Sequence, residues 1–242
     1  MPAPTAVTLL HLLPTRTAGA AENMAVDFLL LQRYPVPGVL RFRHYEWRGA
    51  AFTFGLSQEL AWVRGQIEPH GHVDLCRRPT GGGIVDHRND WTYSLVVPRA
   101  HGLYDERATT AYRQVHDCLA AALVALGQPA VVKPCADCAP AAGPAGVCFQ
   151  RAETFDVVHG TTGAKIAGAA MKRNKHGLLV QGSIEKASVA PLDWDDFQGR
   201  FTTELARVLQ AEAQEVPWPE LNEDEVAGLT EQYSSPEWME YR

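Results

Sequence analysis

The stretch Arg77-Arg78-Pro79-Thr80-Gly81-Gly82-Gly83-Ile84-Val85-Asp86-His87 places two arginines, three consecutive glycines and a histidine within eleven residues. Residues 72–76 before it and 91–97 after it alternate apolar and polar side chains, which predicts a strand on each side. A dinucleotide site needs a helix after the glycines, and a P-loop needs Gly-Lys-Ser/Thr, which is absent, so the stretch fits neither. Two interpretations remain: a structural hairpin with arginines in solvent, or a loop whose backbone approaches a ligand closely.

The rest of the chain predicts an α+β fold with a mixed, largely antiparallel sheet flanked by helices, because strands and helices come in groups and do not alternate regularly. Apolar periodicity predicts helices over residues 20–34, 105–126, 194–213 and 220–233. Alternation predicts further strands over 39–47, 51–55, 154–158, 164–170 and 178–185, whereas the composition of 133–146 predicts a loop.

Composition is that of an ordinary globular protein. The chain has 242 residues, 46% of them hydrophobic, and a formal net charge of −6, so we expect no nucleic-acid partner. It has neither an 18-residue apolar run nor a secretory signal at its start, so we expect a cytoplasmic protein without a membrane partner. The odd count of five cysteines favours reduced thiols over a disulfide framework.

Two further positions are candidates for chemistry. Lys165 opens a strand of small residues that would permit close ligand approach, although a lone lysine is more often simply solvated. Cys148 follows the long loop, and a nearby ammonium could lower the pKa of its thiol, although a free cysteine is more often inert. Cys135 and Cys138 have metal-ligand spacing, but no second pair follows, so we expect no metal site.

Taken together, these motifs resemble the biotin/lipoate protein ligase and acyltransferase superfamily. The similarity runs from about residue 8 to 240 in the family's order, through four segments: Ala20-Ala21-Glu22-Asn23-Met24-Ala25-Val26-Asp27, Ala51-Phe52-Thr53-Phe54-Gly55-Leu56-Ser57-Gln58, the Arg77–His87 loop, and Lys165-Ile166-Ala167-Gly168-Ala169-Ala170. It implies one catalytic domain over residues 1–242, with the class II aminoacyl-tRNA synthetase/biotin synthetase-like fold and without a separate C-terminal accessory domain.

Members of this superfamily differ in reaction. Lipoate-protein ligases activate the acid with ATP, whereas octanoyltransferases take the acyl group as a thioester from acyl carrier protein. The transferase branch is favoured by Cys148-Phe149, which stands 165 − 148 = 17 residues before the lysine, and by Trp91-Thr92-Tyr93-Ser94-Leu95-Val96-Val97, which resembles the transferases' Leu-Thr-Tyr-Ser-Val. The expected activity is acyl transfer to a lysine of a lipoyl carrier domain, such as glycine cleavage H protein or an E2 subunit, without a cofactor. ATP and Mg would be needed if the chain is a ligase.

The resemblance assigns catalysis to Cys148 and Lys165 and substrate binding to Arg77, Arg78, Thr80, Gly81, Gly82, Gly83, His87, Gly168, Ala170 and Gln181. The arginine pair and the run Lys172-Arg173-Lys175 would meet an acidic carrier, unless that run is a solvated turn. The chain departs from the transferase pattern at Ala169, Met171 and Gln181, the last in place of a family histidine. A non-catalytic acyl-binding homologue is therefore a third hypothesis.

Overall fold

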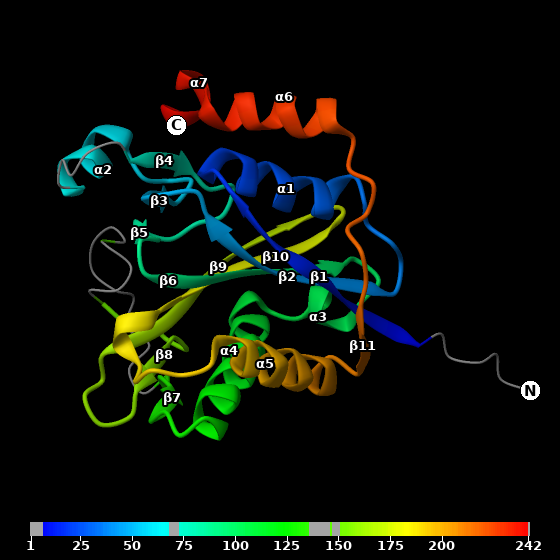
Figure 1. The fold of residues 1–242 in the computed structure, drawn as a ribbon, viewed down its shortest axis with the longest axis vertical. Helices are drawn as coiled ribbons and strands as arrows, with labels where there is room; N and C mark the ends of the chain where they lie inside the picture. Colours follow the sequence, from blue (N-terminus) through cyan, green and yellow to red (C-terminus); the bar gives the residue numbers. More distant parts are fainter. Residues whose placement is uncertain (1–6, 68–72, 136–145, 147–150, 242) are drawn as a thin grey trace, which may run out of the picture.

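The computed structural model describes residues 7–67, 73–135, 146 and 151–241. An eight-stranded sheet runs through the middle of the structure (Figure 1). Strand β1 pairs in parallel with β11 and β2, and every other neighbouring pair is antiparallel. In spatial order the strands are β11 (Ala211–Glu215), β1 (Thr8–Ala18), β2 (Val39–Trp47), β6 (Asp90–Pro98), β10 (Gly177–Glu185), β9 (Lys165–Asn174), β8 (Val157–His159) and β7 (Ala130–Val132).

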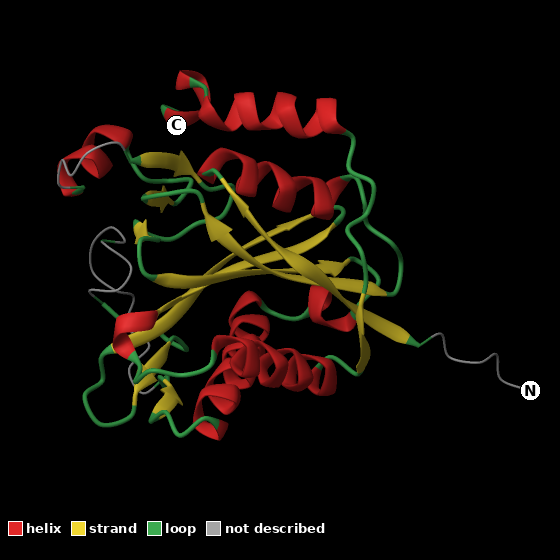
Figure 2. Ribbon diagram, viewed as in Figure 1, coloured by secondary structure: helices red, strands yellow, loops and turns green. Residues whose placement is uncertain are grey.

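Helices cover both faces of this sheet (Figure 2). Helices α4 and α5 lie on one face, and α1 and α6 lie on the other. The helices are α1 (Ala20–Gln32), α2 (Leu60–Gln66), α3 (Gly102–Asp105), α4 (Ala108–Ala125), α5 (Trp194–Val208), α6 (Glu223–Ser234) and α7 (Pro236–Met239), with a 3₁₀ turn at Lys186–Ser188. No helix in the described ranges combines the length and apolarity needed to cross a membrane.

A three-stranded sheet carries the glycine loop on the α1 side of the molecule (Figure 1). Its central strand β3 (Ala51–Phe54) pairs in parallel with β4 (Asp74–Arg77) and antiparallel with β5 (Val85–Asp86). The loop therefore begins at the end of β4 and returns into β5. This confirms that the glycines lie between strands, so phosphate binding at a following helix N-terminus does not apply here.

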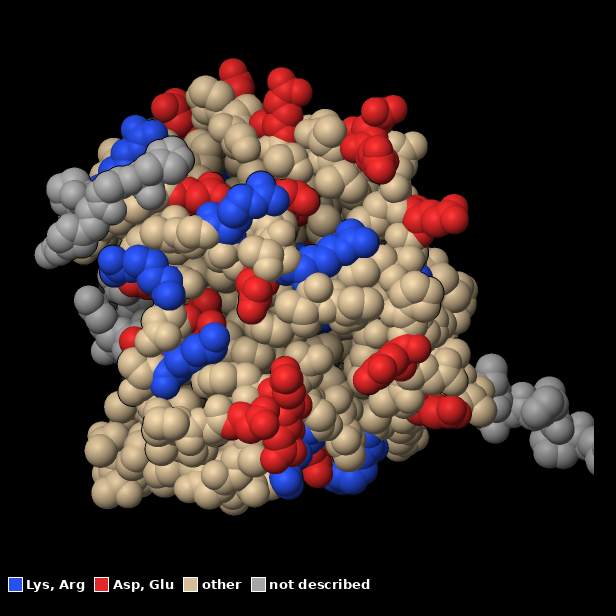
Figure 3. Space-filling model, viewed as in Figure 1, with Lys and Arg blue, Asp and Glu red and all other residues tan. Residues whose placement is uncertain are grey.

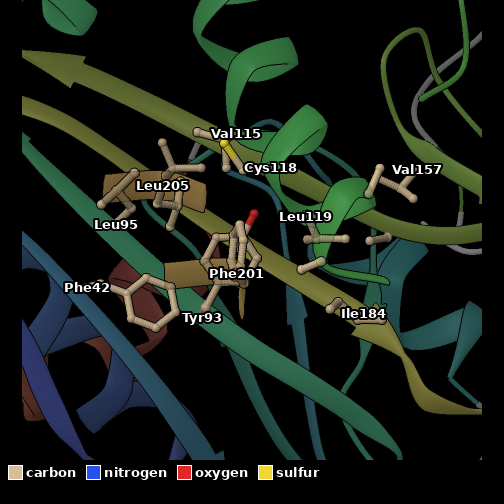
Figure 4. Close-up of a cluster of buried hydrophobic side chains, with 14 of the residues drawn as sticks. Phe42, Tyr93, Leu95, Val115, Cys118, Leu119, Val157, Ile184, Phe201 and Leu205 are labelled. Carbon is tan, nitrogen blue, oxygen red and sulfur yellow. The ribbon is translucent and has the colours of Figure 1, made fainter. Parts of the chain in front are cut away.

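The alternation in β6 explains how the central sheet serves two purposes. Trp91, Tyr93 and Leu95 join the main hydrophobic core with residues of α4 and α5 (Figure 4). The intervening Thr92 and Ser94 point to the opposite face, and both are buried. One face of the strand thus builds the core, while the other supplies polar groups beneath the small sheet.

The α+β expectation is confirmed, and the strand predicted over 39–47 is β2. The single helix expected over 194–213 is wrong. Helix α5 ends at Val208, Gln210 adopts a left-handed φ of 51°, and β11 then pairs with β1. Its sequence, Ala-Glu-Ala-Gln-Glu, consists of good helix formers, so tertiary pairing overrides local propensity. The helix expected over 105–126 is also shorter, because α3 ends at Asp105 and α4 begins at Ala108.

Candidate active site

A pocket lies between the polar face of the central sheet and the small sheet. It contains about 490 Å³ of empty space, part of which opens to solvent. Met24, Tyr45 and Trp47 give it an apolar and aromatic side, and strands β9 and β10 give it a floor of small residues. The remaining lining residues are Thr53, Arg78, Gly82, Val85, His87, Thr92, Lys165, Gly168, Ala169, Ala170, Gln181, Gly182 and Ser183.

The glycine loop folds around the guanidinium of Arg78. One nitrogen of that group donates to the carbonyls of Gly81 (2.8 Å) and Gly83 (3.0 Å). Gly82 has φ +89°, and a Cβ there would lie 3.1 Å from the guanidinium. A Cβ on Gly55 would lie 2.0 Å from the carbonyl oxygen of Gly82, so the loop packs directly on backbone. Glycine is needed at Gly82 for its left-handed backbone conformation and at Gly55 for the close approach of backbone atoms.

Gln181 ties the loop to the sheet and to α1. Its amide oxygen accepts from the Thr80 hydroxyl at 2.8 Å, and its amide nitrogen donates to Asp27 at 2.7 Å. Asp27 is fully buried and pairs with the buried guanidinium of Arg43 at 2.7 Å. A neutral histidine also offers one donor and one acceptor, so glutamine at this position preserves both hydrogen bonds that a histidine could make.

His87 also lines the pocket and is held at both ring nitrogens. Its Nδ1 lies 2.7 Å from Asp90, and its Nε2 lies 2.7 Å from the Thr53 hydroxyl, which accepts from Arg78. With a neutral imidazole, Nδ1 donates to Asp90 and Nε2 accepts from Thr53. Burial acts to raise the pKa of Asp90, but His87 and two hydroxyl hydrogen bonds outweigh burial and lower it. Trp47 stacks on the imidazole at 4.0 Å between ring centroids.

Lys165 reaches the pocket as half of a buried ion pair. Its Nζ lies 2.8 Å from Oδ2 of Asp156, and these side chains are 7% and 1% exposed. A Cβ on Gly168 would lie 2.7 Å from Lys165 Nζ and 3.1 Å from Asp156 Oδ1, so the missing side chain makes room for the pair. The lysine is therefore fixed in position, and the alternative of a solvated lysine is wrong.

Arg77 does not face the pocket, which corrects its assignment to substrate binding. Its guanidinium is buried and makes four hydrogen bonds to the carbonyls of Leu56, Gln58 and Met239. Trp238 donates in return to the Arg77 carbonyl at 2.9 Å. Because Arg77 and Arg78 are 1% and 5% exposed, the expectation that this pair meets a carrier protein at the surface is also wrong.

The cysteines divide into three groups. Cys76 and Cys118 are free and buried, and burial raises the pKa of both thiols, that of Cys118 to about 12. Cys135 is disulfide-bonded, so the expectation of reduced thiols is wrong at that position. Cys138 and the catalytic candidate Cys148 lie outside the described residues. Gly146, two positions before Cys148, accepts a hydrogen bond from the Ile84 backbone, directly after the glycine run.

The structure brings most of the expected site together. Arg78, Gly82, His87, Lys165, Gly168, Ala170 and Gln181 line the pocket, while Gly81 and Gly83 accept from Arg78 and Thr80 donates to Gln181. Sequence reasoning missed the three buried carboxylates behind these groups, Asp27, Asp90 and Asp156. The signal for Asp90 was its spacing of three residues from His87, whereas no local pattern marked the other two.

Surface charge adds little to this description. On the face shown in Figure 3, basic side chains are interspersed with acidic ones and form no single patch. In the run expected to bind a carrier, Lys172 donates to the Pro79 carbonyl at 3.3 Å and Arg173 donates to the Glu106 carbonyl at 2.5 Å. Within the described ranges, no group of three or more His, Cys, Asp or Glu side chains could hold a metal ion.

Comparison with curated proteins finds octanoyltransferases. The protein named Octanoyltransferase LipM in Oceanobacillus iheyensis is 32% identical over 187 residues, which cover 74% of this chain and 64% of that protein. The LipM of Symbiobacterium thermophilum is 29% identical over 240 residues, covering 90% and 84%. The matches to the first three curated relatives span 60–64% of the relatives' length.

Solved structures with the same fold are lipoate-protein ligases. A putative lipoate protein ligase from T. acidophilum with bound lipoic acid superposes with a TM-score of 0.73 at 20% identity, covering 95% of this chain and 98% of that one. Lipoate-protein ligase A bound with ATP gives 0.72 at 19% identity, covering 96% and 98%. The family model described as the lipoyl protein ligase A/B catalytic domain matches residues 19–229, and this chain belongs to that family.

Proposed function

We propose that this chain is an octanoyltransferase of protein lipoylation. It moves an octanoyl (or lipoyl) group from acyl carrier protein, through a thioester on Cys148, to a lysine of a lipoyl carrier domain. The observation that carries this proposal is the buried Lys165–Asp156 pair, which fixes an ammonium in a pocket with an apolar side. The curated relatives named Octanoyltransferase LipM support the transferase reaction over the ligase reaction.

The first step is thioester exchange. The Cys148 thiolate attacks the octanoyl carbonyl, the bond from that carbonyl to the carrier's sulfur breaks, and the departing thiolate takes up a proton. Lys165 stabilises the negative charge that develops on the carbonyl oxygen, an effect worth about 3 to 4 kcal/mol per donor in other enzymes. Because one thioester replaces another, the step needs no nucleotide.

The second step forms an amide. The neutral amine of the acceptor lysine attacks the Cys148 thioester, loses a proton, and releases the Cys148 thiolate for another cycle. The amide is more stable than the thioester, so transfer runs toward the carrier domain. Glycine cleavage H protein and E2 subunits are the acceptors we propose, and one solved neighbour is a bipartite lipoate protein ligase studied with its E2 lipoyl domain.

The backbone around the pocket supports a reaction at Cys148. The Gly146 carbonyl accepts from the Ile84 backbone at 3.2 Å, so residue 146, two positions before Cys148 in the sequence, lies beside the glycine loop. The loop itself is held in place by Arg78 and Gln181, and the acyl chain would lie against Met24, Tyr45 and Trp47. His87 orients the loop and takes no proton in this scheme.

Mass spectrometry of the intact protein after incubation with octanoyl-acyl carrier protein tests the proposal. We expect a hydroxylamine-sensitive adduct of one octanoyl group, absent in Cys148→Ala and retained in the control Cys118→Ala, whose thiol is buried in the core. Product formation only with ATP and free octanoate, unaffected by Cys148→Ala, would identify a ligase instead. Absence of turnover with both donors would leave the non-catalytic acyl-binding homologue.

A further inference from the structure

The residue before Asp156 has an unusual backbone. Phe155 adopts a left-handed φ of 67°, which bulky side chains rarely do, and such conformations persist where surrounding contacts impose them. The Phe155 backbone donates to the Lys133 carbonyl at 3.0 Å, and the Lys133 backbone donates to the Asp156 carbonyl at 2.8 Å. The third contact comes from α4, where Nδ1 of His116 lies 2.6 Å from the Phe155 carbonyl oxygen.

His116 suits this contact only as the tautomer that is protonated at Nδ1. A carbonyl only accepts, so Nδ1 must carry the proton. The ring is fully buried and Nε2 has no partner among the described residues, so a second proton there would be unsolvated. Burial lowers the pKa of His116 to about 4, which keeps the imidazole neutral in the cytoplasmic pH range.

Tyr112 lies one turn earlier on α4 and holds the carboxylate. Its hydroxyl is 2.5 Å from Oδ1 of Asp156 and accepts from the Ala169 backbone N–H at 3.0 Å. Because Asp156 Oδ1 accepts, the hydroxyl proton points to the carboxylate. The other carboxylate oxygen accepts from the Glu153 backbone at 2.7 Å and from Lys165. Asp156 is thereby fixed by partners on both oxygens.

The two α4 residues act together. The rings of Tyr112 and His116 meet edge to face at 4.1 Å, as expected for positions i and i+4 on one helix face. Tyr112 lies on the same helix as the core residues Val115 and Leu119, yet its hydroxyl ends at the Lys165–Asp156 pair. Helix α4 therefore carries a polar pair within an otherwise apolar face, directed at the site.

We infer that Tyr112 and His116 are positioning residues, which hold Phe155 and Asp156 and so fix the Lys165 ammonium for acyl transfer. This inference rests on the proposed function for its kinetic consequence. The competing explanation is that both side chains only fill the core.

Tyr112→Phe tests the inference because it deletes one oxygen and keeps the ring. We expect kcat to fall at least tenfold while KM for the acyl donor changes less than twofold. The matched control is Tyr104→Phe, which removes a tyrosine hydrogen bond to the Asn174 carbonyl at 3.0 Å, away from the pocket, and should leave both constants within twofold. A kcat for Tyr112→Phe within twofold of wild type overturns the inference.

Two further comparisons separate positioning from stability. In an Asp156→Asn background, Tyr112→Phe should lower kcat less than twofold, because Asp156, through which Tyr112 acts, is already altered. An undiminished tenfold fall in kcat contradicts the inference. His116→Asn retains a donor near the Nδ1 position, so it should recover most of the kcat lost in His116→Leu. Equal kcat values for these two variants would also contradict it.

A readout independent of turnover keeps the inference distinct from the proposed function. Trace labelling with an amine-reactive ester, followed by peptide mass spectrometry, measures the reactivity of Lys165. We expect at least threefold faster labelling of Lys165 in Tyr112→Phe than in wild type and in Tyr104→Phe. Equal rates overturn the inference, whereas absence of turnover in the wild-type protein with either donor refutes only the proposed function.

Discussion

Replacing Gly168 by alanine should damage the site and spare the fold. The added Cβ would lie 2.7 Å from Cε and Nζ of Lys165 and 3.1 Å from Asp156. Ordinary contacts between such atoms are about 3.5 to 4.0 Å, so the ammonium must move by about 1 Å. Misplacement of a reacting group by about 1 Å costs on the order of 100-fold in rate. The obstructing atoms are the far end of the Lys165 side chain rather than backbone, so we expect a stability loss of about 1 kcal/mol.

The matched control lies on the neighbouring strand. A Cβ on Gly182 would lie 2.3 Å from the ring of Tyr93, which is fully buried in the core, and overpacking of this kind costs about 1 to 3 kcal/mol or more. The two variants should therefore rank in opposite order by stability in urea denaturation and by rate in single-turnover acyl transfer. Gly168→Ala should lose rate, and Gly182→Ala should lose stability. A wild-type rate in Gly168→Ala, or unfolding as severe as in Gly182→Ala, would refute the reasoning.

Three other predictions concern stability and the loop. The pKa of His116 is about 4 in the folded chain and 6.5 in the free side chain, so the unfolded chain binds more protons between these pH values. The free energy of unfolding should therefore fall by about 3 kcal/mol as the pH drops from 7 to 4. Urea melts of His116→Asn should show a shallower dependence of this free energy on pH. Arg77→Met removes the hydrogen-bond donor from three buried carbonyls and should lower the free energy of unfolding by about 3 kcal/mol in the same melts. The control Arg88→Met, whose ion pair is half exposed, should lower it by about 0.5 kcal/mol. Gln181→Leu removes both of its hydrogen bonds and should lower the acyl-transfer rate at least tenfold, whereas Gln181→His should lose much less; equal rates in these variants would contradict the anchoring role.

Local sequence was informative where the signal is local. The alternation of β2 and β6 follows from side chains that point to opposite faces of a strand, and these strands were found. Motif residues such as Lys165 and His87 were found through the family resemblance, and both line the pocket. Neither pattern depends on residues that are far away in the sequence.

The rest depends on contacts between distant segments. Asp156 meets Tyr112 across 44 positions, and its role follows from the way β8 and α4 pack together. Strand β11 consists of helix formers and is a strand because β1 lies beside it. Arg77 is the last residue of β4 and bonds the carbonyls of Leu56, Gln58 and Met239, whereas Arg78 opens the glycine loop and bonds its carbonyls, a difference that adjacency in sequence does not reveal.

The contact between Arg77 and Met239 joins residues 162 positions apart, at the base of the glycine loop. Synthesis must therefore reach residue 239 before this contact at the base of the glycine loop can form. Contacts of such long sequence separation form late and slow folding. Strands β2, β6, β9 and β10 all precede α7 in the sequence, so these central strands can pair before the base of the glycine loop is fastened to α7.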